Sequence, residues 1–174
     1  AGILLGDPGI IMSYVFPGHV KRKFRLGIIP HFVDWDHRVI KTWRARFGTD
    51  VLFIRPTGEP GKIIRKIKSC NAIVSSSLHG LVVADSFDIP NIRFVIRETM
   101  PPELDYKYDD YYSAYNERPK ALEVDGSETI EALLEMVSLR TAAVAVVKEN
   151  LYTLIRKVCC QFRKHPVSAL IEKI

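Results

Sequence analysis

The chain has 174 residues, a formal net charge of +5, and apolar and charged fractions of 47% and 26%, which are proportions typical of a soluble globular domain. No run of about 18 apolar residues is present, which excludes a membrane-spanning helix, and no signal peptide opens the sequence. Three cysteines, two of them adjacent, form neither a disulfide framework nor a metal-binding Cys pair. We therefore expect a cytoplasmic domain with reduced thiols and no metal site.

The positive charge is concentrated near the C-terminus. From residue 148 onward, six basic residues stand against two acidic ones, a net charge of +4. No nucleic-acid recognition motif accompanies this charge, so we expect no nucleic-acid partner. A basic tail is also typical of contact with a membrane surface, and the sequence thus suggests a peripheral, membrane-associated form as an alternative to a purely cytoplasmic one.

Strands and helices are expected to alternate from residue 24 onward. Apolar runs predict strands at residues 24–30, 51–54, 72–74 and 92–96. Helical spacing of apolar residues predicts a helix that includes 39–47 and ends at Gly48, a second that opens at Pro60 and Gly61, and a third at 79–87. This alternation predicts an α/β fold, a Rossmann-like parallel sheet with right-handed crossovers and flanking helices.

The pattern changes after residue 96. A loop is expected at 100–102, followed by a polar, aromatic-rich stretch at 106–116. A helix begins near Ser127, and a longer one over about 141–163 keeps its apolar residues at a period of 3.6. We expect residues 1–126 to form the Rossmann-like domain and residues 127–174 to form a helical segment that packs on it or toward a missing N-terminal half.

Polar residues follow each of the four predicted strands. His31 and Asp34 follow the first, Arg55 follows the second, three serines and His79 follow the third, and Arg97 and Glu98 follow the fourth. In open parallel sheets, ligands bind beyond the carboxyl ends of the strands. An edge rich in cationic and hydroxyl groups predicts a site for an anion.

The third junction, Ser75-Ser76-Ser77-Leu78-His79-Gly80, is the most informative of these. The start of a helix offers unpaired N–H groups and a partial positive charge, which suit a phosphate or a carboxylate. Gly80 allows close approach, and His79 can exchange a proton near neutral pH. The alternatives are that the serines only cap the helix, that His79 is structural, and that Arg55 makes a surface ion pair.

The segment from Ser75 to Asp85, followed by Ile89-Pro90, resembles the signature of the polysaccharide pyruvyl transferases. Three further pieces resemble this family in order and spacing, namely Leu-Gly-Asp-Pro-Gly at 5–9, Leu-Gly-Ile-Ile-Pro-His-Phe-Val-Asp at 26–34 and Lys-Tyr-Asp-Asp-Tyr-Tyr-Ser at 107–113. The resemblance covers about residues 3–118. The sequence contains no P-loop, GxGxxG, GxSxG or HExxH motif, which argues against several other enzyme classes.

The resemblance implies a glycosyltransferase-B-like fold of two facing halves, of which this chain is the C-terminal one and a fragment that is inactive alone. The family moves pyruvate from phosphoenolpyruvate to a sugar of an exopolysaccharide or cell-wall precursor and closes a cyclic ketal, with no cofactor. The implied general acid is His79, and the implied substrate contacts are Ser76, Ser77, Leu78, Gly80, Arg55, His31, Asp7 and Lys107. The implied partners are phosphoenolpyruvate and a glycan or lipid-linked sugar acceptor.

Two other functions remain open from the sequence. A glycosyltransferase of similar fold would bind the diphosphate of a nucleotide sugar at the same helix start. A non-catalytic half-domain would keep the fold without the reaction.

Overall fold

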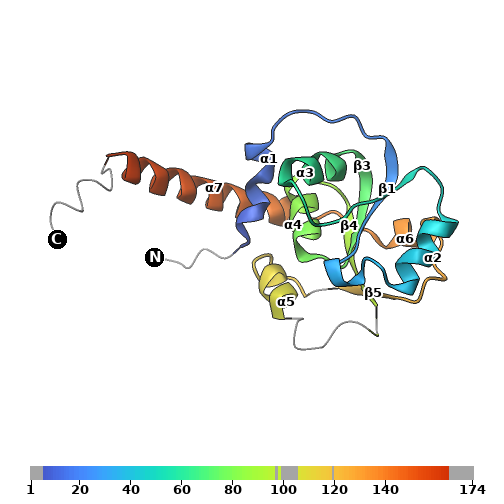
Figure 1. Ribbon diagram of the computed structural model, residues 1–174. Helices are drawn as coiled ribbons and strands as arrows, with labels where there is room; N and C mark the ends of the chain where they lie inside the picture. The colour runs from blue at the N-terminus through green and yellow to red at the C-terminus, as the bar shows by residue number, and fades with distance from the viewer. Residues whose placement is uncertain (1–5, 97, 99–105, 119, 165–174) are drawn as a thin grey trace.

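The computed structural model describes residues 6–96, 98, 106–118 and 120–164, with side chains described as far as residue 160 (Figure 1). Within these residues, five strands form one parallel sheet in the order β2-β1-β3-β4-β5. The strands are Phe24–Ile29 (β1), Val51–Phe53 (β2), Cys70–Ser75 (β3), Asn91–Ile96 (β4) and Ala121–Val124 (β5). The predicted parallel α/β sheet is confirmed, and β5 is an additional edge strand.

The main helices are Arg38–Arg46 (α2), Pro60–Lys68 (α3), Leu78–Ser86 (α4), Tyr106–Ser113 (α5), Ile130–Met136 (α6) and Thr141–Lys164 (α7). Shorter helical turns are Pro8–Ile11 (η1), Met12–Val15 (α1) and Phe32–Asp34 (η2). The expected helices are all present within a few residues of their predicted bounds. The loop expected at 100–102 lies outside the described residues, and the aromatic stretch after it contains α5.

Helices cover both faces of the sheet because its strands are apolar on both sides. On one face, Leu26 and Ile28 of β1 pack against Val39 and Trp43 of α2, and Leu133 of α6 joins the same core. On the other face, Ile29 and Ile73 pack with Ile67 of α3 and Ala84 of α4. The two faces alternate along β1, as the pleat of a strand requires.

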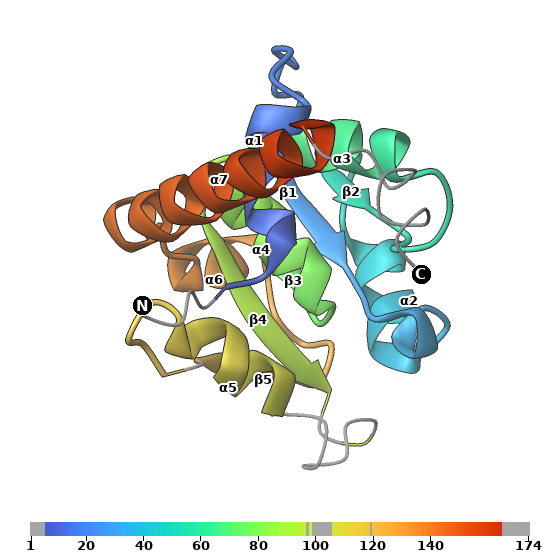
Figure 2. The same cartoon turned by 90° about the vertical axis from the view of Figure 1, so that its left-hand side faces the viewer.

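A further layer covers α4 on the side away from the sheet. Ile10 of η1, Tyr108 of α5 and Val147 of α7 share a buried cluster with Leu81 and Val82 of α4. An all-round apolar helix such as α4 needs cover on every side, and this layer supplies it. Figure 2 shows α7 crossing over η1 and α4, and Figure 1 shows its far half extending beyond the body of the domain.

The three cysteines are free thiols. Cys70 is buried in the sheet core, and this burial raises the pKa of its thiol to about 12, so it stays protonated at neutral pH. Cys159 and Cys160 are exposed on α7. No helix in the described part of the chain has the length and apolarity needed to cross a bilayer.

Candidate functional site

The strand order reverses between β1 and β3. From β1 the chain passes through α2 to β2 on one side, then crosses through α3 to β3 on the other side of β1. At such a reversal the loops that follow the two central strands diverge and leave a crevice, which is where doubly wound sheets bind ligands. Here the two loops meet directly, because the amide of His31 donates to the hydroxyl oxygen of Ser76 at 2.8 Å.

The helix α4 begins at this crevice with an uncapped N-terminus. Ser77 is its N-cap residue, with extended backbone angles (φ −100°, ψ 125°), and its side chain makes no capping hydrogen bond. The N–H groups of Leu78 and His79 have no partner inside the helix, since the first turn of any helix lacks the carbonyls they would need. These amides and the helix dipole are therefore available to an anion.

A pocket of about 310 Å³ lies in front of this helix start. Five of the residues predicted for the site line it, and they come from the loops after β1 and β3, from α4 and from α5: His31, Ser77, Leu78, His79 and Lys107. Phe32, Pro56 and Thr57 complete the wall. The pocket thus combines two imidazoles, one ammonium group and a helix N-terminus, a set of groups that attracts phosphate or carboxylate.

His79 stands at the mouth of this pocket, and 81% of its side chain is exposed. Among the described residues it pairs with Asp7, whose Oδ2 lies 3.9 Å from Nε2 of His79. Asp7 is itself held in place, because its Oδ1 accepts a hydrogen bond of 2.7 Å from the amide of Gly9 and so caps η1. An exposed imidazole with one distant partner supports little of the fold.

His31 is more enclosed than His79. Burial, followed by the positive charge of Lys107, lowers the pKa of His31, and the carboxylate of Asp34 opposes this shift. The imidazole is therefore neutral in the empty site at neutral pH. A bound anion would oppose the effect of Lys107 and favour the protonated form.

Three of the predicted junction residues support the site from behind. Ser75 and Ser76 are 0% and 1% exposed, and the Ser76 hydroxyl donates to Asp34 at 2.9 Å. The hydroxyl of Ser75 bridges the ends of β1 and β3, with the carbonyl oxygens of Ile29 and Ser77 at 2.9 and 2.8 Å. Gly80 packs on Ser75, and a Cβ atom at Gly80 would lie 2.5 Å from the Ser75 hydroxyl oxygen, so no larger residue fits here without a shift of β3.

Arg55 and Glu98 are not among the residues that line this pocket. The Arg55 guanidinium lies 5.4 Å from the ring centre of Trp35, whose ring also holds Arg44 at 3.9 Å. Arg97 lies outside the described residues. Glu98 is exposed and accepts a hydrogen bond of 2.8 Å from Arg38.

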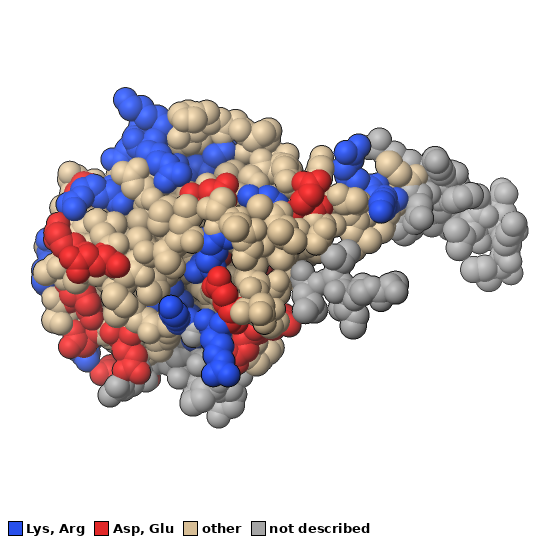
Figure 3. All heavy atoms as spheres, turned by 180° about the vertical axis from the view of Figure 1, so that it is seen from behind, with Lys and Arg blue, Asp and Glu red and all other residues tan. Residues whose placement is uncertain are grey.

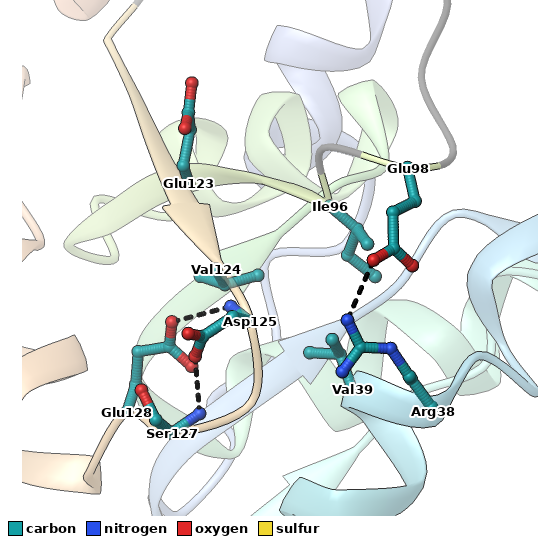
Figure 4. Close-up of a pocket in the computed structure, with 9 residues that line it drawn as sticks. All are labelled: Arg38, Val39, Ile96, Glu98, Glu123, Val124, Asp125, Ser127 and Glu128. Carbon is teal, nitrogen blue, oxygen red and sulfur yellow. Dashed lines mark hydrogen bonds and ion pairs between the residues drawn. The ribbon is translucent and has the colours of Figure 1, made fainter.

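A second pocket, of about 390 Å³, lies at the ends of β4 and β5 (Figure 4). Its polar lining is mainly acidic, with Glu98, Glu123, Asp125 and Glu128 against Arg38. Glu128 and Asp125 hold the turn that leads into α6, through the amides of Asp125 and Ser127 respectively. This acidic lining disfavours an anion, whereas the pocket at α4 has a basic lining. In the part of the chain that the structure describes, no three His, Cys, Asp or Glu side chains are grouped to hold a metal ion.

The fold adds two residues that were not among the predicted substrate contacts. Asp34 is buried next to Ser76, and Tyr108 of α5 donates from its hydroxyl to the carbonyl oxygen of Ser76 at 2.8 Å. Both lie in segments that resemble the family, yet nothing in the sequence alone shows that they converge on one serine.

Comparison with known proteins identifies one family. A family model described as "Polysaccharide pyruvyl transferase" matches residues 3–98, more than half of the chain and including the ends of β1 and β3. "Uncharacterized protein L143" of Acanthamoeba polyphaga mimivirus is 33% identical over 120 residues, which are 66% of this chain and 41% of that protein. "Succinoglycan biosynthesis protein ExoV" of Rhizobium meliloti (strain 1021) is 31% identical over 87 residues, 48% of this chain and 26% of that protein.

The aligned part thus covers well under half the length of both relatives. No solved structure matches the chain significantly. The family model spans the loop that carries His31 and the junction that carries His79, which line the pocket. It also spans the Gly-Asp-Pro turn, whose Asp7 lies 3.9 Å from His79. The chain belongs to the polysaccharide pyruvyl transferase family.

Proposed function

We propose that this chain is the donor-binding half of a polysaccharide pyruvyl transferase, and that it takes phosphoenolpyruvate as its donor. Membership of the family supports a transferase, and the relative named for succinoglycan biosynthesis supports a role in modifying a polysaccharide. The observation that carries the proposal is the pocket in which His31, Lys107 and the free N-terminus of α4 converge beside His79.

The proposed reaction makes a cyclic ketal in three steps. A general acid protonates the methylene carbon of phosphoenolpyruvate, which becomes a methyl group and leaves an oxocarbenium-like carbon. One sugar hydroxyl attacks this carbon and loses its proton. A second hydroxyl of the same sugar then displaces inorganic phosphate and loses its proton, which closes the ring. Two C–O bonds form and the C–O bond to phosphate breaks, with no oxidant or reductant.

The surroundings of His79 suit its role as the acid. On one side lies the cationic pocket, which can hold the phosphate and the carboxylate. On the other side lies an apolar hollow of about 350 Å³ that His79 shares with Ile29, Ile63 and Val83. The methylene carbon that receives the proton is itself apolar, so an acid placed between a polar and an apolar wall can reach it. Ser77 and the amides of Leu78 and His79 are the proposed anion donors, with Asp7 orienting His79.

Calorimetric titration of the 174-residue chain tests the donor. We expect phosphoenolpyruvate to bind more tightly than UDP-glucose, because the pocket offers cationic groups for two separate anions. Replacing Lys107 by Gln should weaken this binding about tenfold, since a charged hydrogen bond is lost. The matched control Lys41→Gln, at an exposed position of α2, should leave it unchanged.

Two results would contradict the proposal in different ways. Tighter binding of UDP-glucose would favour the glycosyltransferase alternative, in which a diphosphate occupies the start of α4. If neither compound binds, and phosphate does not bind either, the chain is a non-catalytic half-domain.

We also propose that the far half of α7 contacts an anionic membrane surface, which would bring the enzyme to a lipid-linked acceptor. The apolar stripe of α7 is buried at Val144, Val147 and Leu151 but exposed further along at Leu154 and Val158. Arg156 and Lys157 lie off this stripe, and Figure 3 shows basic side chains at the far end of the described part of α7. This is the pattern of an interfacial helix.

Co-sedimentation with phosphatidylserine-containing vesicles tests this contact. The double change Arg156→Gln and Lys157→Gln should reduce binding about 30-fold, because each basic residue contributes about 1 kcal/mol near an anionic surface. Val158→Glu should abolish binding, whereas Thr153→Glu on the polar face should weaken it only modestly. Absence of wild-type binding at low salt would remove the proposal.

A further inference from the structure

Ser76 is the point where three parts of the chain meet. Its hydroxyl accepts from the amide of His31 at 2.8 Å and donates to Oδ2 of Asp34 at 2.9 Å. Its own amide donates to the carbonyl of Ile29 at 3.1 Å, and its carbonyl accepts from Tyr108 at 2.8 Å. The single hydroxyl proton is therefore committed to Asp34. Ser76 thus fixes the position of the loops and has no proton left for a ligand.

The carboxylate that receives this proton is itself unusual. Asp34 is 3% exposed, and while Oδ2 accepts from Ser76, Oδ1 is buried without a hydrogen-bond donor among the described residues. A buried carboxylate with one unsatisfied oxygen costs free energy and calls for an explanation. The ends of β1 and β3 could be joined by a neutral side chain at no such cost. Holding the loops together therefore does not explain why residue 34 carries a negative charge.

The charged groups around His31 indicate what the carboxylate does. Asp34 of η2 favours the protonated form of this imidazole, and Lys107 of α5 disfavours it, together with burial. His79 of α4 lines the same pocket, and the ring of Phe32 lies 4.5 Å from that of His31. When an anion enters, Lys107 is offset by the ligand. The buried charge of Asp34 then favours the imidazolium together with the ligand.

We propose that Asp34 is a positioning residue of the anion site: through Ser76 it fixes the end of β3 against the loop of His31, and its buried charge keeps His31 protonated when the anion is bound. The inference rests on the proposed function only for the identity of that anion. His31 then binds the ligand as an imidazolium that two negative groups stabilise, the ligand and Asp34. The ligand or Asp34 alone would stabilise the imidazolium less well, because partial burial of His31 disfavours its charged form.

The test is Asp34→Asn in the 174-residue chain. The amide oxygen of Asn can still accept from Ser76, so the variant removes the charge and keeps the hydrogen bond. The imidazole titration of His31 is followed by long-range ¹H–¹⁵N NMR, first without ligand. We expect the pKa of His31 to fall in Asp34→Asn and to stay in place in Asp36→Asn, which makes the same change at an exposed position two residues later.

Binding of inorganic phosphate near pH 6.5 supplies the second measurement. We expect Asp34→Asn to bind phosphate on the order of tenfold more weakly, which is the change expected when a protonation equilibrium moves by one pH unit. Ser76→Ala keeps the buried charge of Asp34 and removes the hydrogen bond. It should weaken phosphate binding, while the pKa of His31 stays above the pKa that His31 has in Asp34→Asn.

An unchanged His31 titration in a folded Asp34→Asn protein, with amide spectra like those of the wild type, would overturn the inference and leave Asp34 a structural residue. If Asp34→Asn unfolds, Ser76→Ala decides the question. A His31 pKa in Ser76→Ala equal to that in Asp36→Asn would support a charge that acts independently of the hydrogen bond, and a lower pKa would contradict the inference. If wild-type protein binds neither phosphate nor phosphoenolpyruvate, the proposed function fails, while the ligand-free titration still decides the role of Asp34.

Discussion

Replacing His79 by Gln in the complete enzyme is expected to lower turnover by about 10²- to 10⁴-fold, which is the usual contribution of a general acid. Gln retains a hydrogen-bonding side chain but cannot transfer a proton. The free energy of unfolding should stay unchanged, because 81% of the His79 side chain is exposed and its nearest charged partner, Asp7, is 3.9 Å away. A large loss of rate without a loss of stability distinguishes a catalytic role from a structural one.

A general acid is active only while it carries its proton. The wild-type pH profile should therefore show a limb on which the rate falls as pH rises and the acid loses its proton. This limb should be absent from the profile of His79→Gln. A substitution that only displaced the ligand would lower the rate but keep the limb.

His37→Gln is the matched control. His37 caps α2 by accepting from the amide of Val39 at 3.3 Å, and it lies 3.4 Å from Glu98, away from the pocket. Its replacement should leave turnover near the wild-type rate. If His79→Gln retains near-normal turnover with an unchanged melting temperature, His79 is not the acid and only lines the cleft.

The sheet and its helices could be predicted because their signals are local. β1 and β3 each contain a short apolar run, and α2 and α3 place apolar residues on one face, so each element shows its signal within about ten residues. β5 was missed because Ala121–Val124 is short and only Val124 is buried in it, which leaves no apolar run to read. α5 was missed because its buried side is made of tyrosines, and their hydroxyls are satisfied by distant partners such as Ser76 and Asp85.

The site could be predicted as an edge of the sheet but not as a set of contacts. A parallel sheet places the residues after β1 and β3 side by side whatever their identity, so His31 and His79 could be brought together from topology. Ser76 and Arg55 could not be placed, because the direction of each side chain depends on groups far along the chain, Asp34 for Ser76 and Trp35 for Arg55. Tertiary contacts of this kind leave no periodic signal.

Arg140→Met is expected to destabilise the domain by about 3–5 kcal/mol, the usual cost of removing one partner of a buried ion pair. The side chains of Arg140 and Asp85 are 9% and 1% exposed, and Nη2 of Arg140 lies 3.0 Å from Oδ1 and 3.1 Å from Oδ2 of Asp85. Met fills much of the volume of Arg without its charge. The carboxylate of Asp85 would then be left buried without a cation.

The hydrogen bonds that remain cannot replace the cation. Tyr111 donates to Asp85 at 2.6 Å, and burial, reinforced by Asp85, raises the pKa of this tyrosine well above its ordinary value, so it stays a neutral donor. Asn91 donates to Asp85 at 2.7 Å and itself accepts from Arg140 at 2.6 Å, so the substitution also leaves the Asn91 oxygen without this donor. The pair links the residue before α7 to the C-terminal end of α4, the helix whose other end carries His79.

Urea denaturation measures the effect, with Arg38→Met as the control. Arg38 pairs with Glu98 at 2.8 Å, but both side chains are more than half exposed, and such surface pairs contribute only about 0–1 kcal/mol. The double variant Arg140→Met with Asp85→Asn should recover much of the lost stability, because it removes the buried charge that the single change leaves unpaired. An equal, small cost for Arg140→Met and Arg38→Met would show that water reaches the Asp85 carboxylate. In that case the contact between α7 and α4 would depend on the apolar packing of Val144 and Val147 rather than on the ion pair.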